Sequence, residues 1–147
     1  MNETMKRTTV TKIKVLIVDD LPQVRHGLRT VLQLMEDIEV IAEASNGLEA
    51  VQLAGQFTPD IVVMDLEMPE MDGFEATRQI KRHHLAKGVV VLTIHSSRHA
   101  RERAASVGVD AFIEKGAAIE TLVEAIREVW SSEQLSVNNI QLLNTDN

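Results

Sequence analysis

The sequence predicts an α/β fold in which helices cover both faces of a parallel β-sheet. Nearly continuous apolar runs recur along the chain, as at 15–18, 62–64 and 89–92, and strands buried on both faces have this composition. Segments with apolar residues at helical spacing alternate with these runs. Alternation of strands and helices is typical of a parallel sheet wrapped on both faces.

The first half of the chain predicts two strand–helix pairs. A strand is expected over about residues 14–18, and the helix after it has one apolar face, formed by Val24, Leu28, Val31, Leu32 and Met35. A second strand is expected over about 39–43. The next helix has apolar residues from Leu48 to Phe57 and stops before Pro59, since the residue before a proline disfavours helical geometry.

The second half predicts three further pairs. A strand over 62–64 is followed by a loop, by a helix containing Phe74, Thr77 and Ile80, and by a strand that ends at Thr93. The helix expected over 97–107 has few large apolar residues, so it should be the most weakly anchored. A short strand over 111–113 precedes the last helix, which has apolar residues at 119, 122, 123, 126 and 129.

Length and composition indicate one ordinary domain. The chain has 147 residues, of which 44% are hydrophobic, and we place the domain at residues 13–130. Residues 1–12 and 131–147 lack a clear apolar periodicity and are expected to be flexible. The absence of cysteine excludes disulfides and thiolate metal sites.

Charge and hydropathy restrict the surroundings in which the protein works. The formal net charge of −7 disfavours non-specific binding to nucleic acid. No apolar run is long enough to span a bilayer, and the N-terminal residues lack the apolar core of a signal peptide. We therefore expect a cytoplasmic protein that does not interact with membranes.

Carboxylates directly follow two of the apolar runs, with Asp19 and Asp20 after the first strand and Asp65 after the third. Because parallel strands meet at one carboxyl edge, where α/β folds bind ligands, these side chains should lie together. Each like-charge pair about 4 Å apart costs roughly 4 kcal/mol at an effective dielectric constant of about 20. The cluster should therefore bind a divalent cation or hold a proton, and oxygen ligands favour Mg²⁺ as the cation. Removing Asp19 or Asp20 should accordingly stabilise the metal-free protein.

Polar side chains follow two other strands: the hydroxyl of Thr93 and the ammonium of Lys115. Taken singly, Asp19 or Asp20 could be a helix N-cap, Thr93 a β-branched strand residue and Lys115 a surface charge. Together they supply a carboxylate nucleophile, metal ligands, a hydroxyl and a lysine. These groups are suited to transferring a phosphoryl group onto Asp65.

These residues give the sequence its resemblance to the receiver domain of two-component response regulators, over about residues 13–130. The segments VDDLPQVRHGL, DIVVMDLEMPEMDGFEAT and AFIEKGA are most similar to LuxR/NarL-type regulators, in which a small residue follows the lysine. The resemblance implies a flavodoxin-like doubly wound sheet with five strands in the order 2-1-3-4-5. It also implies a signalling domain that catalyses only its own phosphorylation and dephosphorylation.

The resemblance assigns roles to the site residues. Asp65 would accept the phosphoryl group from a histidine kinase or a phosphotransfer protein. Asp20, Asp65 and the backbone carbonyl of Glu67 would hold Mg²⁺, and Asp19 would act on the ion through water. Thr93 and Lys115 would assist the transfer.

The resemblance further implies a conformational switch that involves Thr93 and Phe112, which stands where many family members have tyrosine. The switch would change the face formed by the helix at 97–107, the strand at 111–113 and the last helix. Arginines and glutamates on this face suit self-association or partner binding, at Arg98, Arg101, Arg103, Glu120, Glu124 and Glu128. No output domain follows Trp130 in this sequence, so we expect either a stand-alone receiver or part of a longer protein, without direct DNA binding.

Without the family resemblance, the same residues would also allow a different class of function. A Mg²⁺-dependent phosphohydrolase with an aspartate nucleophile would need a second acid two residues after the nucleophile, and Glu67 occupies this position. Such enzymes normally carry their nucleophile near the chain start and have a cap, which this chain lacks. A nucleotide-binding module is disfavoured because no glycine-rich phosphate loop follows any strand.

Overall fold

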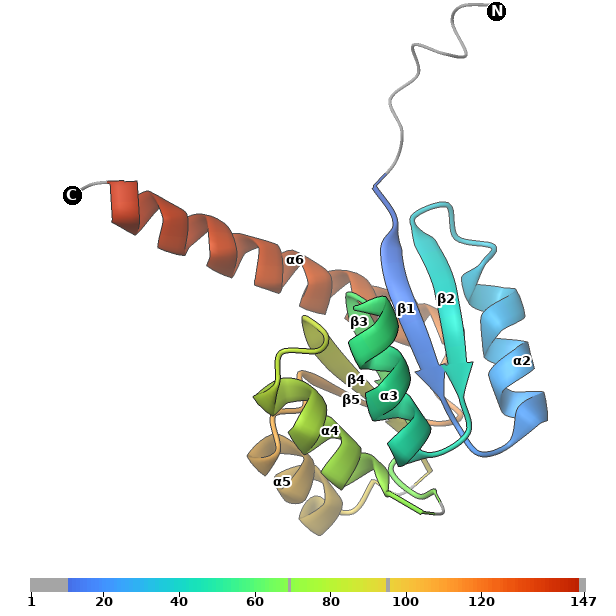
Figure 1. Cartoon of the computed structure of the whole chain (residues 1–147). Helices are drawn as coiled ribbons and strands as arrows, with labels where there is room; N and C mark the ends of the chain where they lie inside the picture. The colour runs from blue at the N-terminus through green and yellow to red at the C-terminus, as the bar shows by residue number, and fades with distance from the viewer. Residues whose placement is uncertain (1–10, 69, 95, 146–147) are drawn as a thin grey trace, which may run out of the picture.

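The computed structural model describes residues 11–68, 70–94 and 96–145, and the side chains as far as residue 133. One parallel sheet has five strands in the order β2-β1-β3-β4-β5, as predicted (Figure 1). In chain order the elements are β1 (Ile13–Val18), α2 (Pro22–Leu32), β2 (Ile38–Ala44), α3 (Gly47–Phe57), β3 (Ile61–Met64), α4 (Gly73–Arg82), β4 (Gly88–Thr93), α5 (Arg98–Ser106), β5 (Ala111–Glu114) and α6 (Ile119–Thr145). The flavodoxin-like fold is therefore confirmed.

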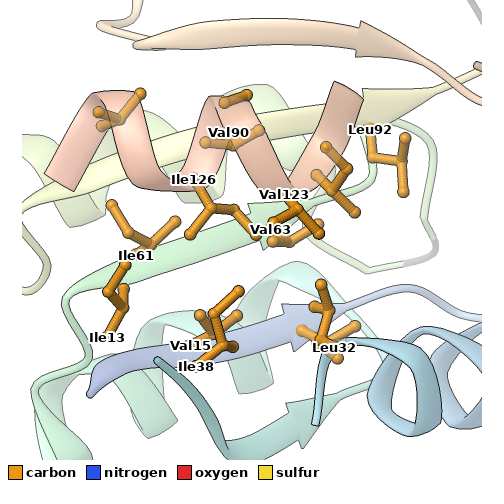
Figure 2. Close-up of a cluster of buried hydrophobic side chains, with 14 of the residues drawn as sticks. Ile13, Val15, Leu32, Ile38, Ile61, Val63, Val90, Leu92, Val123 and Ile126 are labelled. Carbon is orange, nitrogen blue, oxygen red and sulfur yellow. The ribbon is translucent and has the colours of Figure 1, made fainter. Parts of the chain in front are cut away.

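The central strands are buried on both faces, which explains their continuous apolar sequences. On one face, Val15 of β1, Val63 of β3 and Val90 of β4 pack against Leu32 of α2 and Ile126 of α6 (Figure 2). On the other face, a second cluster joins the intervening strand residues to α3 and α4 through Leu16, Val18, Val62, Met64, Ala50, Ala54, Ala76 and Ile80. This two-sided core holds the carboxyl ends of the strands in fixed register.

Three helices begin with a side-chain cap. Asn46 before α3 accepts a hydrogen bond from the Glu49 N–H, Asp72 before α4 from the Glu75 N–H, and Ser97 before α5 from the Ala100 N–H. The cap residues follow the loops that leave the carboxyl ends of β2, β3 and β4. The caps therefore anchor the loops that surround this edge of the sheet.

Helix α5 is weakly anchored, as its sequence predicted, because Ala104 is its only buried side chain. Two arginines supply further contacts: the Arg101 guanidinium lies 4.5 Å from the Phe112 ring centroid, and that of Arg103 lies 4.0 Å from the Phe74 ring centroid. Exposed cation–π contacts contribute only about 0.5–1 kcal/mol each. Helix α5 is thus fastened to β5 and α4 by contacts that cost little to break.

Helix α6 is longer than the sequence analysis predicted, since it continues past Trp130 to Thr145. No proline or glycine interrupts it, and the polar residues after Trp130 are compatible with a helix. Arg127 anchors its first half through two hydrogen bonds to Asp37, at 2.8 and 2.9 Å. The expected flexible N-terminal segment lies, apart from residues 11 and 12, outside the described residues. Among those described, no helix has the length and apolar character needed to cross a membrane.

Candidate functional site

Backbone hydrogen bonds bring four strand ends together at the carboxyl edge of the sheet. The Asp65 N–H donates to the Val18 carbonyl at 3.0 Å, so Asp65 lies beside the end of β1. On the other side, the Lys115 N–H donates to the Thr93 carbonyl at 2.8 Å. Since β3 and β4 are neighbours in the sheet, the polar residues that follow four separate apolar runs share one edge.

The three predicted carboxylates form a cluster. One carboxylate oxygen from each of Asp19, Asp20 and Asp65 lies within 4.8 Å of the others. The Lys115 ammonium lies 2.7 Å from an Asp19 oxygen and 3.6 Å from an Asp65 oxygen. Because one ammonium faces three carboxylates, two negative charges remain uncompensated if all four groups are ionised. The site therefore attracts cations.

The surroundings shift two pKa values in this cluster. Burial raises the pKa of Asp65; the Lys115 charge opposes this effect and the Asp19 charge reinforces it. Burial alone would lower the pKa of Lys115, but its hydrogen bond to Asp19 and the charge of Asp65 raise it. Because the pKa of Asp65 is raised in the folded, metal-free protein, the protonated side chain favours folding at low pH, and this stabilisation is lost as pH rises through the raised pKa. A bound cation would offset the cost of the buried negative charge by favouring the carboxylate.

Asp19 and Asp20 differ although they are adjacent. The Asp19 side chain is 2% exposed; it accepts a hydrogen bond from the Leu21 N–H at 2.9 Å and pairs with Lys115 through its other oxygen. Asp20 is more exposed, and among the described residues its carboxylate has no hydrogen bond or ion pair. Asp19 is thus fixed by the protein, whereas the Asp20 carboxylate is available to a ligand.

The loop after Asp65 is held by two close backbone approaches. A Cβ on Gly73 would lie 2.1 Å from the Asp65 carbonyl oxygen, and a Cβ on Gly47 would lie 2.0 Å from the Met71 carbonyl oxygen. The Gly47 N–H also donates to this Met71 carbonyl at 2.9 Å. Only glycine permits such approaches. The loop that contains Glu67 is therefore pinned near both ends.

The other predicted site residues lie at or near the same edge. Thr93 is fully buried as the last residue of β4. The Glu67 side chain is exposed, while its N–H faces an Asp65 oxygen at 3.4 Å. Phe112 is half-buried in β5, beneath the guanidinium of Arg101. The structure thus brings Asp19, Asp20, Asp65 and Lys115 together, with Thr93 at the end of the neighbouring strand.

The donor set fits Mg²⁺. All three clustered groups offer carboxylate oxygens, which are the ligands that Mg²⁺ prefers, and these oxygens lie within 4.8 Å of one another. No nitrogen or sulfur ligand belongs to the cluster, which disfavours zinc. The Asp cluster is therefore suited to a hard cation.

Sequence reasoning missed Arg25, which lies on α2 beside the cluster. Its Nη1 donates to the Asp19 carbonyl at 2.8 Å. The available signal was a basic residue one turn into the helix that follows the two aspartates. Gly47 and Gly73 were also missed, because close backbone approaches between distant segments leave little trace in one sequence.

This geometry agrees with the comparisons to known proteins. Residues 15–127 match the family described as the response regulator receiver domain. The chain belongs to this family. It is therefore a receiver domain of two-component signal transduction, a class of domain that is phosphorylated on an aspartate.

Curated relatives and solved structures support this membership. The receiver is 39% identical to the response regulator protein VraR of Staphylococcus saprophyticus over 84% of this chain and 59% of the relative. It is 37% identical to response regulator UvrY of Escherichia coli, over 87% of this chain and 59% of UvrY. A crystal structure of a LuxR-family DNA-binding response regulator from Staphylococcus aureus has a TM-score of 0.76 and 33% identity, over 80% of this chain and 98% of that one. The receiver thus spans about three-fifths of the length of the curated relatives it matches.

Proposed function

We propose that Asp65 is the phosphoacceptor and that a histidine kinase or a phosphotransfer protein is the donor. One observation carries this proposal: Asp65 is a buried carboxylate at the centre of the polar edge, beside Asp19 and Lys115. An Asp65 oxygen would attack the phosphorus of phosphohistidine. The P–N bond would break, and the leaving imidazole would take up a proton.

The proposed metal ligands are Asp20, Asp65 and the backbone carbonyl of Glu67, with Asp19 acting through water. Bound Mg²⁺ would neutralise charge on the phosphoryl oxygens during transfer. Asp19 holds the Lys115 ammonium near Asp65, and the pinned loop holds the Glu67 backbone near the acceptor. These residues orient the acceptor and balance its charge.

The acceptor assignment is tested by labelling. In the presence of Mg²⁺, acetyl phosphate should phosphorylate the parent, and Asp65→Asn should remove the label because the nucleophilic oxygen is lost. Glu67→Gln is the matched control, since it changes an exposed neighbouring acid but retains the backbone carbonyl proposed as ligand. Phosphorylation should be followed by intact mass under identical conditions. Full labelling of Asp65→Asn would disprove the assignment.

The same control separates the receiver from the phosphohydrolase alternative. In a phosphohydrolase, Glu67 would act as an acid on the substrate, so Glu67→Gln would abolish turnover. In a receiver it should leave phosphorylation largely intact. Family membership and the exposed position of the Glu67 side chain favour the receiver.

The proposed output is a switch that involves Thr93 and Phe112. After phosphorylation, Thr93 and Lys115 would move towards the phosphoryl group, and the loop after β4 and Phe112 would rearrange. The weak attachment of α5 supports this proposal, because its contacts break at small cost.

The proposed partners follow from this switch. Phosphorylation would promote self-association or partner binding through α5, β5 and α6, without DNA binding by this chain. The three arginines expected to mediate association already have acidic partners within this domain: Arg98 pairs with Glu102, Arg101 pairs with Glu114, and Arg103 lies 3.9 Å from Asp72. Since Arg101 also covers Phe112, Arg98 is the better probe of association, because its side chain is 92% exposed and its ion pair with Glu102 stays within α5.

A further inference from the structure

The carboxylate of Asp20 needs an orientation that its own side-chain contacts do not supply. Within the described part of the chain it has no hydrogen bond or ion pair, whereas Asp19 is fixed by the Leu21 N–H and Lys115. The direction of the Asp20 side chain therefore depends on the backbone at Asp20. This backbone begins with the planar peptide group that joins the Asp19 carbonyl to the Asp20 nitrogen.

Arg25 binds this peptide group from α2. Its Nη1 donates to the Asp19 carbonyl at 2.8 Å, and its Nε donates to a Glu43 oxygen at 3.2 Å. The Arg25 side chain is only 15% exposed, so both contacts lie largely away from water. The rigid guanidinium fork thus links the Asp19–Asp20 peptide to the edge strand β2.

Glu43 is itself held in place. Its other carboxylate oxygen accepts a hydrogen bond from Arg29 at 2.9 Å. Burial alone would raise the pKa of Glu43, but the hydrogen bonds from Arg29 and Arg25 lower it, so Glu43 is ionised at neutral pH. Because Glu43 is ionised and held by Arg29, it can fix the Arg25 guanidinium while Nη1 of Arg25 donates to the Asp19 carbonyl.

We infer that Arg25 is a positioning residue for the cation site: it holds the Asp19–Asp20 peptide so that the Asp20 carboxylate faces Asp65. Among the described residues Arg25 makes no hydrogen bond or ion pair with Asp20 or Asp65, so it would act on a bound cation only through the backbone. This inference rests on the proposed function, in which Asp20 is a ligand of Mg²⁺. Groups that orient metal ligands in this way typically change metal affinity by about 10- to 100-fold when removed.

Arg29 provides a matched control. It lies one turn further along α2 and pairs with the same Glu43 carboxylate, but among the described residues it makes no hydrogen bond to the Asp19 carbonyl. Arg25→Ala and Arg29→Ala remove the same charge from the same helix and leave Glu43 with one arginine each. Only Arg25→Ala frees the Asp19–Asp20 peptide, so a difference between the variants reports positioning and not charge.

The experiment is a Mg²⁺ titration of the full chain, followed by backbone amide shifts in NMR spectra. Arg25→Ala should weaken Mg²⁺ binding about tenfold, whereas Arg29→Ala should change it less than about twofold. Without metal, the Asp20 and Leu21 amide signals should shift in Arg25→Ala and stay near the parent positions in Arg29→Ala. This metal-free signature does not depend on phosphorylation.

Arg25→Lys keeps the charge but cannot reach both Glu43 and the Asp19 carbonyl with a rigid fork, so it should give intermediate Mg²⁺ affinity. If Arg25→Ala does not fold, this variant decides, and affinity equal to that of the parent would overturn the inference. Equal Mg²⁺ affinities of Arg25→Ala and Arg29→Ala would also overturn it. A parent that binds no Mg²⁺ and an Asp65→Asn variant that is still labelled would instead contradict the proposed function.

Discussion

Neutralising Asp19 and neutralising Asp20 should change the stability of the metal-free protein in opposite directions. Asp20 lies within 4.8 Å of two carboxylates and has no compensating contact among the described residues. A like-charge pair at this distance costs about 1 kcal/mol at a dielectric constant near that of water, lower than the sequence-based figure because Asp20 is the most exposed member of the cluster. Allowing for attraction to Lys115, Asp20→Asn should stabilise the metal-free protein by about 1 kcal/mol. This gain corresponds to a rise in Tm of roughly 3 °C for a chain of this size.

Asp19→Asn relieves the same repulsion but also breaks the 2.7 Å ion pair with Lys115. Removing one partner of a buried pair costs about 3–5 kcal/mol, and the lower figure applies here because Lys115 keeps its contact with Asp65 at 3.6 Å; the cost still exceeds about 2 kcal/mol of relieved repulsion. The Leu21 N–H can still donate to the asparagine side-chain oxygen. Asp19→Asn should therefore destabilise the protein by about 1–2 kcal/mol. This outcome revises the expectation from sequence that removing either aspartate is stabilising, because that expectation did not include the Lys115 pair.

Urea unfolding in EDTA at pH 7 measures both effects, and a second series with excess Mg²⁺ provides the linkage test. The two variants have the same net charge, so a general charge effect cannot make them diverge. Added Mg²⁺ should stabilise the parent more than Asp20→Asn, since this variant lacks one proposed ligand. Shifts of the same sign for the two variants without metal would refute the assignment of Lys115 to Asp19.

Two other predictions concern the loop and the output face. Gly47→Ala should destabilise the protein by about 2 kcal/mol or more and weaken Mg²⁺ binding, because its Cβ would lie 2.0 Å from the Met71 carbonyl oxygen. Gly55→Ala is the control, since a Cβ at this position on the same helix would have no atom within 4 Å. In urea unfolding, Gly55→Ala should be neutral or stabilising. Comparable losses in both variants would contradict the proposed pinning of the loop. Beryllofluoride, as a phosphoryl mimic, should raise the sedimentation coefficient of the parent, and Arg98→Glu should reduce this response while Arg82→Glu on α4 should not. Equal responses in all three proteins would exclude association through Arg98.

The strands and the polar residues at the edge of the sheet could be predicted because both follow from local sequence, whereas the strand order came from the family resemblance. A strand buried on both faces is a continuous apolar run, and the polar residues that follow it lie at the carboxyl edge of the sheet. This reasoning locates Asp19, Asp65 and Thr93 without any knowledge of long-range contacts, and it places Lys115, which follows Glu114, near the same edge. It does not specify which carboxylate Lys115 pairs with, since this depends on side-chain geometry between residues 96 positions apart.

The features that sequence reasoning missed depend on tertiary contacts. The pinning of the Glu67 loop needs the backbone of α3 to approach Met71, and the Asn-Gly pair at 46–47 reads equally well as an ordinary helix start. The roles of Arg25 and Arg101 depend on neighbours from β2 and β5. The length of α6 was underestimated because a polar composition is compatible with both a tail and a helix, and no helix-breaking residue distinguishes them.

Lys115 connects the carboxylate cluster to the proposed output face. Its ammonium is nearer to Asp19 than to Asp65 in this structure, so a phosphoryl group on Asp65 would compete with Asp19 for the ammonium. The preceding residue, Glu114, binds Arg101, which also covers Phe112. A shift of Lys115 would therefore strain contacts that hold α5. Because those contacts are weak, we expect a shift of Lys115 after phosphorylation to loosen α5 through Glu114 and Arg101.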